Sequence, residues 1–172
     1  MAASKIRVVI ITLSMRVSKG ERSDLGGDAL TSRIQKAEMQ LAERLVLPDE
    51  KKTLTAHLER ICDQGLADVI LTTGGTGLSP TDITPETTLA VLEKRLPGFE
   101  TAMHLAGMQK TPYAILSRAV AGTRGKTIVV NLPGNPKGAL ENLEAIVQTL
   151  PHAVRVLQAE QVSDQEHRAP VN

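Results

Sequence analysis

Aromatic residues, cysteine and an excess of charge of either sign are almost missing from this chain of 172 residues. It has no tryptophan, and Phe99 and Tyr113 are its one phenylalanine and its one tyrosine. Proteins that bind single-stranded nucleic acid stack several aromatic side chains on successive bases, which one subunit of this protein cannot do. A heterocyclic ligand must therefore be held mainly by other contacts.

The single cysteine, Cys62, excludes an intramolecular disulfide and a cysteine metal cage. Such cysteine usage is typical of the reducing cytoplasm, where we expect the protein to act. The four histidines lack the spacing of zinc ligands, and Ser14 and Ser117 lack an evident histidine partner, so zinc sites and serine hydrolases are not expected. Cys62 occupies an apolar position of an expected helix, which favours a place in the core over nucleophilic chemistry.

Charge and hydropathy indicate an ordinary globular chain. Lysine and arginine number 20 against 19 aspartates and glutamates, so no overall field attracts nucleic acid or an anionic membrane, and we expect neither as a partner. No apolar run approaches the roughly 18 residues that span a bilayer, and no export signal is visible. We expect one domain over residues 1–157, followed by a polar, flexible tail over residues 158–172.

Apolar runs alternate with helical patterns along the chain, which predicts a three-layer α/β/α sandwich with a mostly parallel central sheet. Asp28 and Thr84 are the expected caps of two of the helices. The run at 39–47 reads as a strand, although its composition equally suits a helix. Strands or extended segments are expected at 6–11, 39–47, 68–73, 114–121 and 127–132, and helices at 28–36, 49–64, 84–96, 97–110 and 137–157.

Three unusual loops follow expected strands, and in open parallel sheets ligands bind beyond the carboxyl ends of the strands. The first loop, residues 74–77, reads Gly-Gly-Thr-Gly. Its glycines allow main-chain N–H groups to approach an anion closely, so the loop is a candidate phosphate cradle; a simple tight turn is the alternative. It lacks the lysine of a P-loop and the spacing of a dinucleotide fingerprint, so it supports neither an ordinary ATPase nor a Rossmann dehydrogenase.

Two carboxylates, Asp49 and Asp82, belong to loops that we expect beside this cradle. Either one alone is explained as a helix cap or a turn residue. Two carboxylates that face one phosphate site would repel the substrate unless a magnesium ion lay between them. The pair therefore predicts a metal-dependent phosphate reaction, with both residues as ligands of Mg²⁺.

The third loop, residues 132–137, follows the last expected strand. Prolines on both sides of Gly134 and Asn135 stiffen it, and the amides of Asn131 and Asn135 could bind a heteroaromatic ring or a phosphate. Arg118 interrupts an apolar run nearby in the pattern, so it must either be paired with other protein groups or bind an anion.

Taken in order, these segments closely resemble the molybdopterin adenylyltransferases of molybdenum cofactor biosynthesis. Together with the first strand, the resemblance covers residues 5–157. The segments that carry it are LPDE (47–50), LTTGGTGLSPTDITPE (71–86), PGFETAM (97–103), ILSRAVAGTRGKT (115–127) and NLPGNPK (131–137).

The resemblance implies a molybdopterin-binding domain that forms a homotrimer. It implies that magnesium and ATP are used to adenylylate the terminal phosphate of molybdopterin, that pyrophosphate is released, and that the product passes to a molybdenum insertase. Asp49 and Asp82 match the two critical aspartates of the family. The remaining matched residues, which the resemblance makes substrate contacts, are Ser14, Gly74, Gly75, Thr76, Gly77, Ser117, Asn131, Pro133, Gly134 and Asn135.

One position departs from the family pattern. Relatives commonly have serine-aspartate-arginine after the first strand, whereas this chain has Ser14, Met15 and Arg16. If that aspartate contacts metal or nucleotide in the family, then either binding is weakened here or Asp24 or Asp28 takes its place. If it only shapes the loop, Met15 is harmless. The departure keeps a non-catalytic molybdopterin-binding or carrier protein open as an alternative, and a related nucleotide phosphohydrolase is a second one.

Overall fold

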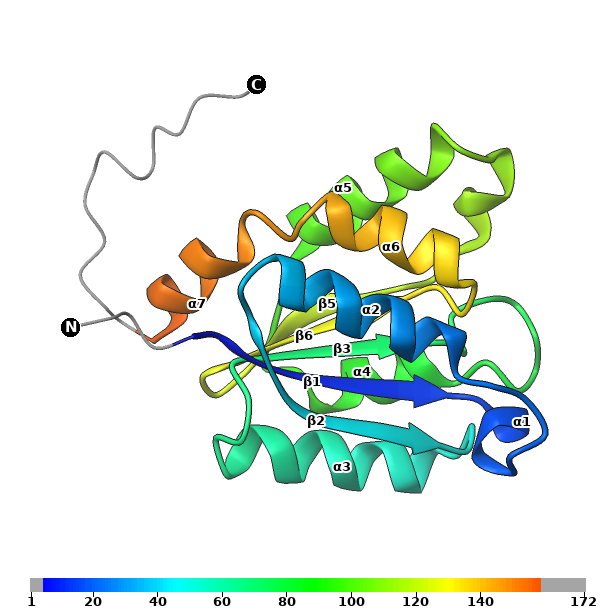
Figure 1. Cartoon of the computed structure of the whole chain (residues 1–172), viewed down its shortest axis with the longest axis horizontal. Coiled ribbons are helices and arrows are strands. Elements are labelled where there is room, and N and C mark those ends of the chain that lie inside the picture. The colour runs from blue at the N-terminus through cyan, green and yellow to red at the C-terminus, as the bar shows by residue number, and fades with distance from the viewer. Residues whose placement is uncertain (1–4, 159–172) are drawn as a thin grey trace.

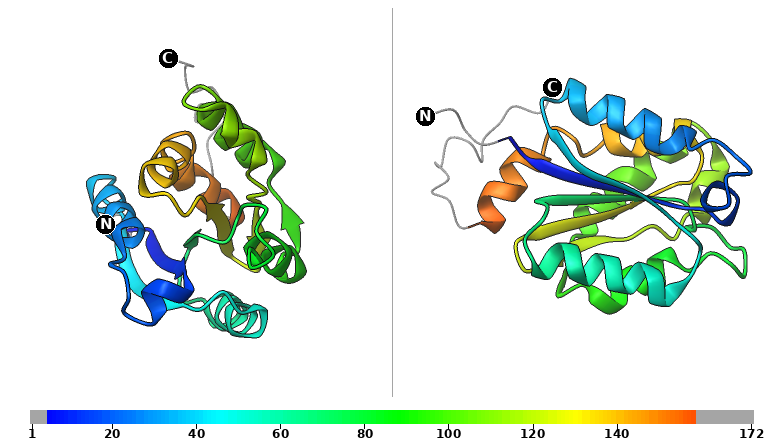
Figure 2. Two further views of the ribbon diagram at one scale, coloured as in Figure 1. Left: turned by 90° about the vertical axis from the view of Figure 1, so that its right-hand side faces the viewer. Right: turned by 60° about the horizontal axis from the view of Figure 1, so that its bottom comes forward.

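A central sheet separates two layers of helices in the computed structural model, which describes residues 5–158 (Figures 1 and 2). The expected three-layer α/β/α sandwich with a mostly parallel sheet is confirmed. Of the expected flexible tail, all but Gln158 lies outside the described residues. Within residues 5–158, no helix is long and apolar enough to cross a membrane.

The sheet has six strands, and the four that build its centre and one edge are parallel. At the other edge, β5 (Ala121–Arg124) pairs antiparallel with both β6 (Thr127–Leu132) and β4 (Lys94–Arg95). Every residue of β3 (Val69–Thr73) and of β6 is buried, which explains why their sequences are mainly apolar and do not alternate with charged residues. The order across the sheet is β2 (Gln40–Leu47), β1 (Arg7–Leu13), β3 (Val69–Thr73), β6 (Thr127–Leu132), β5 (Ala121–Arg124) and β4 (Lys94–Arg95).

Helices cover both faces of this sheet (Figure 2). Buried side chains of α2, α5, α6 and α7 form one core with one face, and those of α3 and α4 form a second core with the other. The short helices α1 and η1 lie in connecting loops (Figure 1). The bounds are α1 (Met15–Ser18), α2 (Leu25–Lys36), α3 (Lys51–Asp63), α4 (Thr84–Val91), α5 (Pro97–Met108), η1 (Pro112–Leu116), α6 (Pro136–Glu144) and α7 (Leu150–Leu157).

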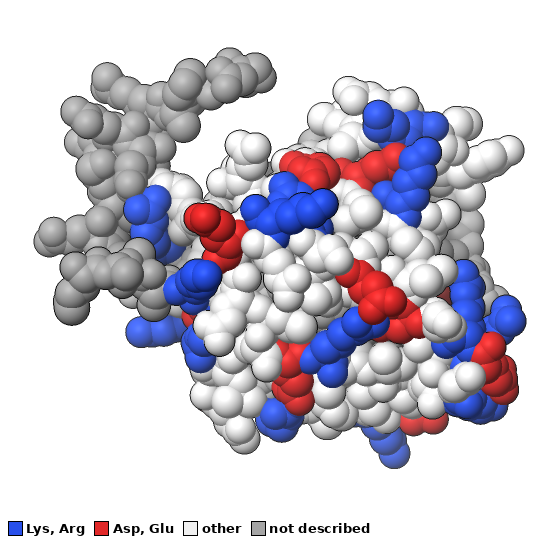
Figure 3. All heavy atoms as spheres, viewed as in Figure 1, with Lys and Arg blue, Asp and Glu red and all other residues white. Residues whose placement is uncertain are grey.

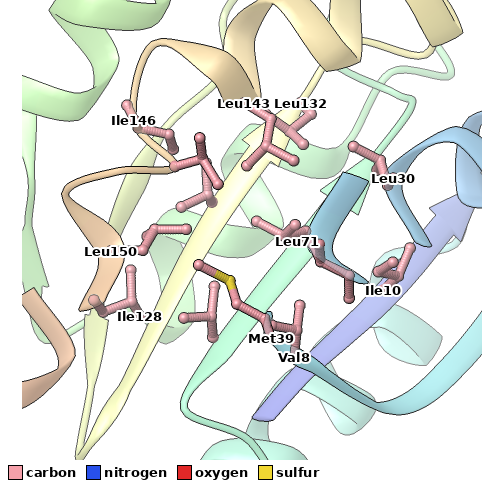
Figure 4. Close-up of a cluster of buried hydrophobic side chains, with 14 of the residues drawn as sticks. Val8, Ile10, Leu30, Met39, Leu71, Ile128, Leu132, Leu143, Ile146 and Leu150 are labelled. Atoms are coloured by element: carbon pink, nitrogen blue, oxygen red, sulfur yellow. The ribbon is translucent and has the colours of Figure 1, made fainter. Parts of the chain in front are cut away.

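Alternation along the strands divides the side chains between the two cores. Val8 and Ile10 point into the core beneath α2 and α6, where they pack with Leu30 and Leu143 (Figure 4). Val9 and its neighbours of the same parity point into the other core. Because buried apolar side chains cover both faces, the sheet is a rigid support for the loops at the carboxyl ends of its strands.

Residues 39–47 contain a strand, β2, so the strand reading of that ambiguous run is confirmed. The cap of α2 is Asp24, not the expected Asp28, because the helix begins three residues earlier and Asp24 Oδ1 accepts a hydrogen bond from the N–H of Gly27. Thr84 is likewise not a cap: it lies inside the first turn of α4, and its hydroxyl donates to the carbonyl oxygen of Gly74.

Three expected segment boundaries are wrong. The helix expected to Leu96 ends at Val91, because the following residues pair with β5 and form the edge strand β4. Residues 114–116 belong to the 3-10 helix η1, which Pro112 opens; residues 117–120 belong to no strand, and β5 begins only at Ala121. The long helix expected to Leu157 is divided into α6 and α7, since Pro151 has no N–H with which to continue a helix from α6.

Candidate functional site

A cavity of about 550 Å³ opens at the carboxyl ends of β3 and β6, between α6 and the segment formed by α5 and η1. The glycine loop, the segment that carries Asp82 and the third loop all line it, so their expected convergence is confirmed. On the face shown in Figure 3, acidic and basic side chains lie interspersed, with no broad patch of one sign. The predicted site residues that line the cavity are Gly75, Thr76, Gly77, Asp82, Ser117, Pro133, Gly134 and Asn135.

The glycine loop has a backbone that only glycine adopts without strain. Gly74 and Gly75 have φ angles of 103° and 64°, in the left-handed region. A Cβ on Gly74 would lie 2.3 Å from the carbonyl oxygen of Leu13, and one on Gly75 would lie 2.4 Å from Oγ1 of Thr84. Gly134 packs against the same turn, because its Cβ would lie 3.2 Å from Cα of Gly74. The first and third loops therefore form one rigid wall.

This wall offers free hydrogen-bond donors. Among the described residues, the N–H groups of Gly75, Thr76 and Gly77 donate to no protein acceptor, whereas that of Gly74 is bonded to the carbonyl oxygen of Leu132. Three consecutive unpaired N–H groups beside a cavity are what a phosphate cradle requires. The arrangement therefore favours the cradle over a simple tight turn.

The carboxylate of Asp82 packs against Gly77, the last glycine of this loop. Its Oδ2 accepts a hydrogen bond from the N–H of Ser79 at 2.9 Å, and a Cβ on Gly77 would lie 2.9 Å from the same oxygen. The side chain lines the cavity and is half-buried. Its carboxylate is thus held next to the free N–H donors.

Asp49 approaches the same loop from the end of β2. Its Oδ2 accepts a hydrogen bond from the main-chain N–H of Met15 at 2.8 Å, and its Oδ1 lies 3.4 Å from the position that a Cβ on Gly75 would take. Asp49 is not among the residues that line the cavity itself. The structure thus brings both predicted carboxylates to the glycine loop, one at each end of it.

These two carboxylates fit magnesium only when substrate supplies further ligands. Among residues 5–158, no group of three or more His, Cys, Asp or Glu side chains could hold a metal ion. Magnesium is commonly held by one or two carboxylates together with water and substrate phosphates. Asp49 and Asp82 beside a phosphate cradle match that pattern, and a metal site made of protein alone does not.

Ser14 lies beside a smaller hollow of about 50 Å³, which Gly74 and Gly134 also line. The Oγ of Ser14 accepts a hydrogen bond from the N–H of Val17 and so caps α1. Asp24 also lines this hollow, but its carboxylate is already bonded to Thr12 and Arg44. Ser14 is therefore next to the site and occupied by helix capping.

Asp28 is the other candidate replacement for the missing family aspartate. It is exposed, and it lines neither the 550 Å³ cavity nor the smaller hollow beside Ser14. Its Oδ1 accepts a hydrogen bond from Nη1 of Arg44 at 2.6 Å. Asp24 and Asp28 thus share one arginine, and neither carboxylate is free to take over the role of an acid at position 15.

Asn131 is fully buried in β6, away from the cavity lining. Its amide nitrogen donates to the hydroxyls of Thr72 and Thr88 at 2.9 and 3.0 Å, and its carbonyl oxygen accepts from the N–H of Val120 at 3.4 Å. All of these contacts tie β6 to β3, to α4 and to the chain before β5. The structure gives Asn131 a role inside the protein and no path to a ligand in the cavity.

The third loop is anchored at both ends. The hydroxyl of Thr73 donates to the carbonyl oxygen of Pro133 at 2.7 Å, and Oδ1 of Asn135 accepts from the N–H groups of Lys137 and Gly138. Asn135 therefore caps α6 and still lines the cavity. The stiffness predicted from the two prolines is reinforced by these contacts.

Several cavity residues were not singled out from the sequence, because they belong to α5, η1 and α6 and to the turn between α5 and η1. Lys137 and Glu141 are four residues apart and so lie on one face of α6. The ring of His104 contacts the carbonyl oxygens of Glu100 and Ser117, which ties α5 to the cavity wall. The residues concerned are Met103, His104, Lys110, Thr111, Tyr113, Lys137, Glu141 and Asn142.

Two further expectations are decided by burial and pairing. Cys62 is buried in the core between α3 and the sheet, as predicted, and burial raises the pKa of its thiol to about 11. Arg118 is paired with protein groups, among them the carboxylate of Glu86. The alternative in which it binds an anion in the cavity is not supported, because its side chain does not line the cavity.

Comparison with known proteins identifies the family. The molybdopterin adenylyltransferase of Helicobacter pylori (strain J99) is 38% identical over 154 residues, which cover 88% of each chain. That of Escherichia coli (strain K12) is 37% identical over 144 residues, 82% of this chain and 73% of the other. The molybdopterin biosynthesis enzyme MoaB from Thermus thermophilus has a TM-score of 0.85 and 42% identity, covering 92% of this chain and 99% of its own.

The family model for a probable molybdopterin binding domain matches residues 9–152, which include every loop of the site described above. The fold, the identity to curated relatives and the extent of this match all agree. The chain belongs to the molybdopterin-binding domain family of molybdenum cofactor biosynthesis.

Proposed function

We propose that this protein is a molybdopterin adenylyltransferase, which transfers AMP from ATP to the terminal phosphate of molybdopterin and releases pyrophosphate. The observation that carries the proposal is the meeting of Asp49 and Asp82 at a glycine loop whose N–H groups are unpaired. That loop opens into a cavity of about 550 Å³, a size that suits a substrate of nucleotide dimensions. Relatives that share the whole domain bear the name of this activity.

The reaction needs no protein nucleophile. A terminal phosphate oxygen of molybdopterin forms a bond to the α-phosphorus of ATP, and the bond from that phosphorus to the bridging oxygen of pyrophosphate breaks, with the electron pair leaving on pyrophosphate. The N–H groups of Gly75, Thr76 and Gly77 orient the phosphates for in-line attack. Because these donors are already in place, they stabilise the developing negative charge without reorganisation. Bound between Asp49 and Asp82, Mg²⁺ would neutralise phosphate charge.

The two ends of the cavity suit different parts of the substrates. Phosphates belong at the glycine loop, and the rings belong toward α5, η1 and α6, where apolar side chains alternate with Thr111, Glu141 and Asn142. Tyr113 stands at this end and is exposed. Because the chain has one tyrosine and no tryptophan, its tyrosine emission comes from Tyr113 alone and reports ligand entry.

The same proposal includes a homotrimer that hands the adenylylated pterin to a molybdenum insertase in the cytoplasm. Apolar side chains are exposed on α5 and η1, where contact between copies would bury them: Leu105, Met108, Ile115 and Leu116. Light scattering should give about three times the mass of the chain. A monomer mass at micromolar protein would contradict the trimer.

The test is release of pyrophosphate by the purified protein with molybdopterin, Mg²⁺ and ATP, each also left out in turn. Asp49→Asn and Asp82→Asn keep the size of the side chain and remove its charge, so we expect loss of turnover with molybdopterin binding retained, followed through Tyr113 emission. Asp63→Asn is the matched control, because Asp63 is an acid paired with Arg124 and outside the cavity lining.

The outcomes separate the alternatives. Pterin-dependent release that both active-site variants lose supports the proposal. Release of phosphate or pyrophosphate without pterin would instead indicate a nucleotide phosphohydrolase. Binding of molybdopterin with no consumption of ATP would indicate a carrier.

A further inference from the structure

Arg118 binds both ends of the loop that carries Asp82. Its Nε donates to the carbonyl oxygen of Gly77 at 2.7 Å, and its Nη2 donates to the carbonyl oxygen of Asp82 at 2.9 Å. Its Nη1 pairs with the carboxylate of Glu86 on α4, and its own main-chain N–H donates to the carbonyl oxygen of Thr76 at 3.0 Å. One guanidinium group therefore spans this loop from its first residue to its last.

The loop, residues 77–82, also closes on itself. The main-chain N–H of Asp82 donates to the carbonyl oxygen of Ser79, and Oδ2 of Asp82 accepts from the N–H of Ser79, both at 2.9 Å. The same Oδ2 packs against Gly77, which has no side chain to displace it. By fixing the main chain at Gly77 and at Asp82, Arg118 fixes where this carboxylate stands relative to the unpaired N–H groups.

Arg118 acts from behind the site. Its neighbours Ser117 and Ala119 line the cavity, whereas the side chain of Arg118 lines a separate shallow hollow on the outer side of the loop. Asp82 lines both. A molecule in the cavity thus touches Asp82 and not Arg118, so any effect of Arg118 on the reaction passes through the loop.

The geometry points to Arg118 as the positioning residue that holds Asp82 in its working place, an inference that rests on the proposed function for its effect on turnover. Lysine keeps the charge but cannot reproduce the planar fork that reaches two carbonyl oxygens and a carboxylate together. Glu86 completes the guanidinium's partners without touching the loop itself. Loss of the fork therefore frees the loop, while loss of Glu86 leaves both bonds to the loop in place.

The experiment compares Arg118→Ala, Arg118→Lys and Glu86→Gln with a matched control, Arg124→Ala. Arg124 is also partly buried, and it also bonds a carboxylate, that of Asp63, and a main-chain carbonyl oxygen, that of Val91. It lies at the turn from β5 to β6, at the opposite end of β6 from the cavity. A general effect of removing such an arginine appears equally in both alanine variants.

Two readouts follow turnover and binding. For Arg118→Ala and Arg118→Lys we expect kcat to fall by about tenfold to a hundredfold, the loss that follows from a shift of about 1 Å in a reacting constellation, with KM for molybdopterin changing much less. Guanidinium ions, added below denaturing concentration, should restore part of the kcat of Arg118→Ala and none of the lysine variant. Glu86→Gln and Arg124→Ala should stay within about twofold of the wild type, a difference of less than about 0.5 kcal/mol in the barrier.

A third readout does not depend on activity. Hydrogen exchange followed by mass spectrometry on a peptide that covers residues 77–83 should speed up in Arg118→Ala, while peptides from α3 and β1 stay protected as in the wild type. Unchanged exchange in this peptide would overturn the inference, as would a kcat within twofold of the wild type or a loss equal to that of Arg124→Ala. If the wild type itself released no pyrophosphate, the proposed function would fail, and the exchange experiment would still decide whether Arg118 holds the loop.

Discussion

The main-chain N–H of Met15 donates a hydrogen bond to Oδ2 of Asp49, with 2.8 Å between nitrogen and oxygen. Met15 is the residue at which this chain departs from the family pattern. Asp49 is one of the protein's two predicted metal ligands. The contact uses the backbone, and the side chain of Met15 is exposed. A methionine can therefore orient Asp49 as well as any other residue with an N–H at this position.

This contact predicts opposite results for two substitutions of Met15. Met15→Ala keeps the N–H and should retain turnover within about twofold. Met15→Pro removes the N–H at the first position of α1, where proline is well tolerated by a helix, so it should lower kcat by about tenfold by freeing Asp49. Pyrophosphate release measured for both variants checks this. Equal activity of the two would show that the bond to Asp49 does not matter.

The glycine loop predicts a separation of activity from stability. In Gly77→Ala the new Cβ meets Oδ2 of Asp82 at 2.9 Å without a left-handed φ, so kcat should fall while the free energy of unfolding changes by about 1 kcal/mol or less. In Gly74→Ala, the φ of 103° and the contact with Leu13 should lower the free energy of unfolding by at least about 1–3 kcal/mol. Urea unfolding and turnover distinguish the two. Gly98→Ala, with open space around it, is the control.

Asn131 and Asn135 should differ in the same way. Asn131→Ala leaves the hydroxyls of Thr72 and Thr88 without their buried partner, so we expect the free energy of unfolding to drop by about 1–3 kcal/mol. The fraction that stays folded should bind molybdopterin with normal affinity. Asn135→Ala should cost about 1 kcal/mol through loss of the cap of α6 and should also raise KM, because Asn135 lines the cavity. A raised KM in folded Asn131→Ala would contradict the structural assignment.

Asp68 should make the fold sensitive to acid. Burial by itself raises the pKa of this carboxyl, but the hydrogen bonds and charge of Arg7 outweigh it and hold the pKa below its usual range. A carboxyl with a depressed folded-state pKa stabilises the protein above its unfolded pKa of about 3.9, and that stabilisation is lost as the pH falls through the folded value. Asp68→Asn should therefore flatten the fall of the urea midpoint below about pH 4. Parallel pH profiles for variant and wild type would refute this role.

Much of the fold follows from local sequence pattern. The mainly apolar runs at 6–11, 68–73 and 127–132 predict β1, β3 and β6, because strands buried on both faces lack a regular alternation of apolar and polar residues. The position of residues 74–77 directly after β3 then places the glycine loop at the carboxyl edge of the sheet. Side-chain periodicity and the conformational freedom of glycine are properties of neighbouring residues, so they can be read without knowing the partners.

The orientation of single residues could not be read in this way. The amide side chain of Asn131 is of a type that often binds ligands. Because side chains alternate along β6, Asn131 points to the same face of the sheet as Val129, toward α4, whereas the cavity lies on the side of α5 and α6. Which parity faces which layer depends on strands and helices that are paired across the sheet. The structure alone therefore separates Asn131 from Asn135.

The sequence by itself determined the fold class, the family and the two carboxylates that meet at the glycine loop. Only the tertiary structure decided that β4 forms an edge strand, that α6 and α7 are separate, and that Arg118 holds the loop of Asp82. The physical reason is the range of the interactions. Element type is set over a few residues, whereas the partners of the Arg118 side chain lie 32 to 41 residues away in the chain and become neighbours only when the sheet has formed.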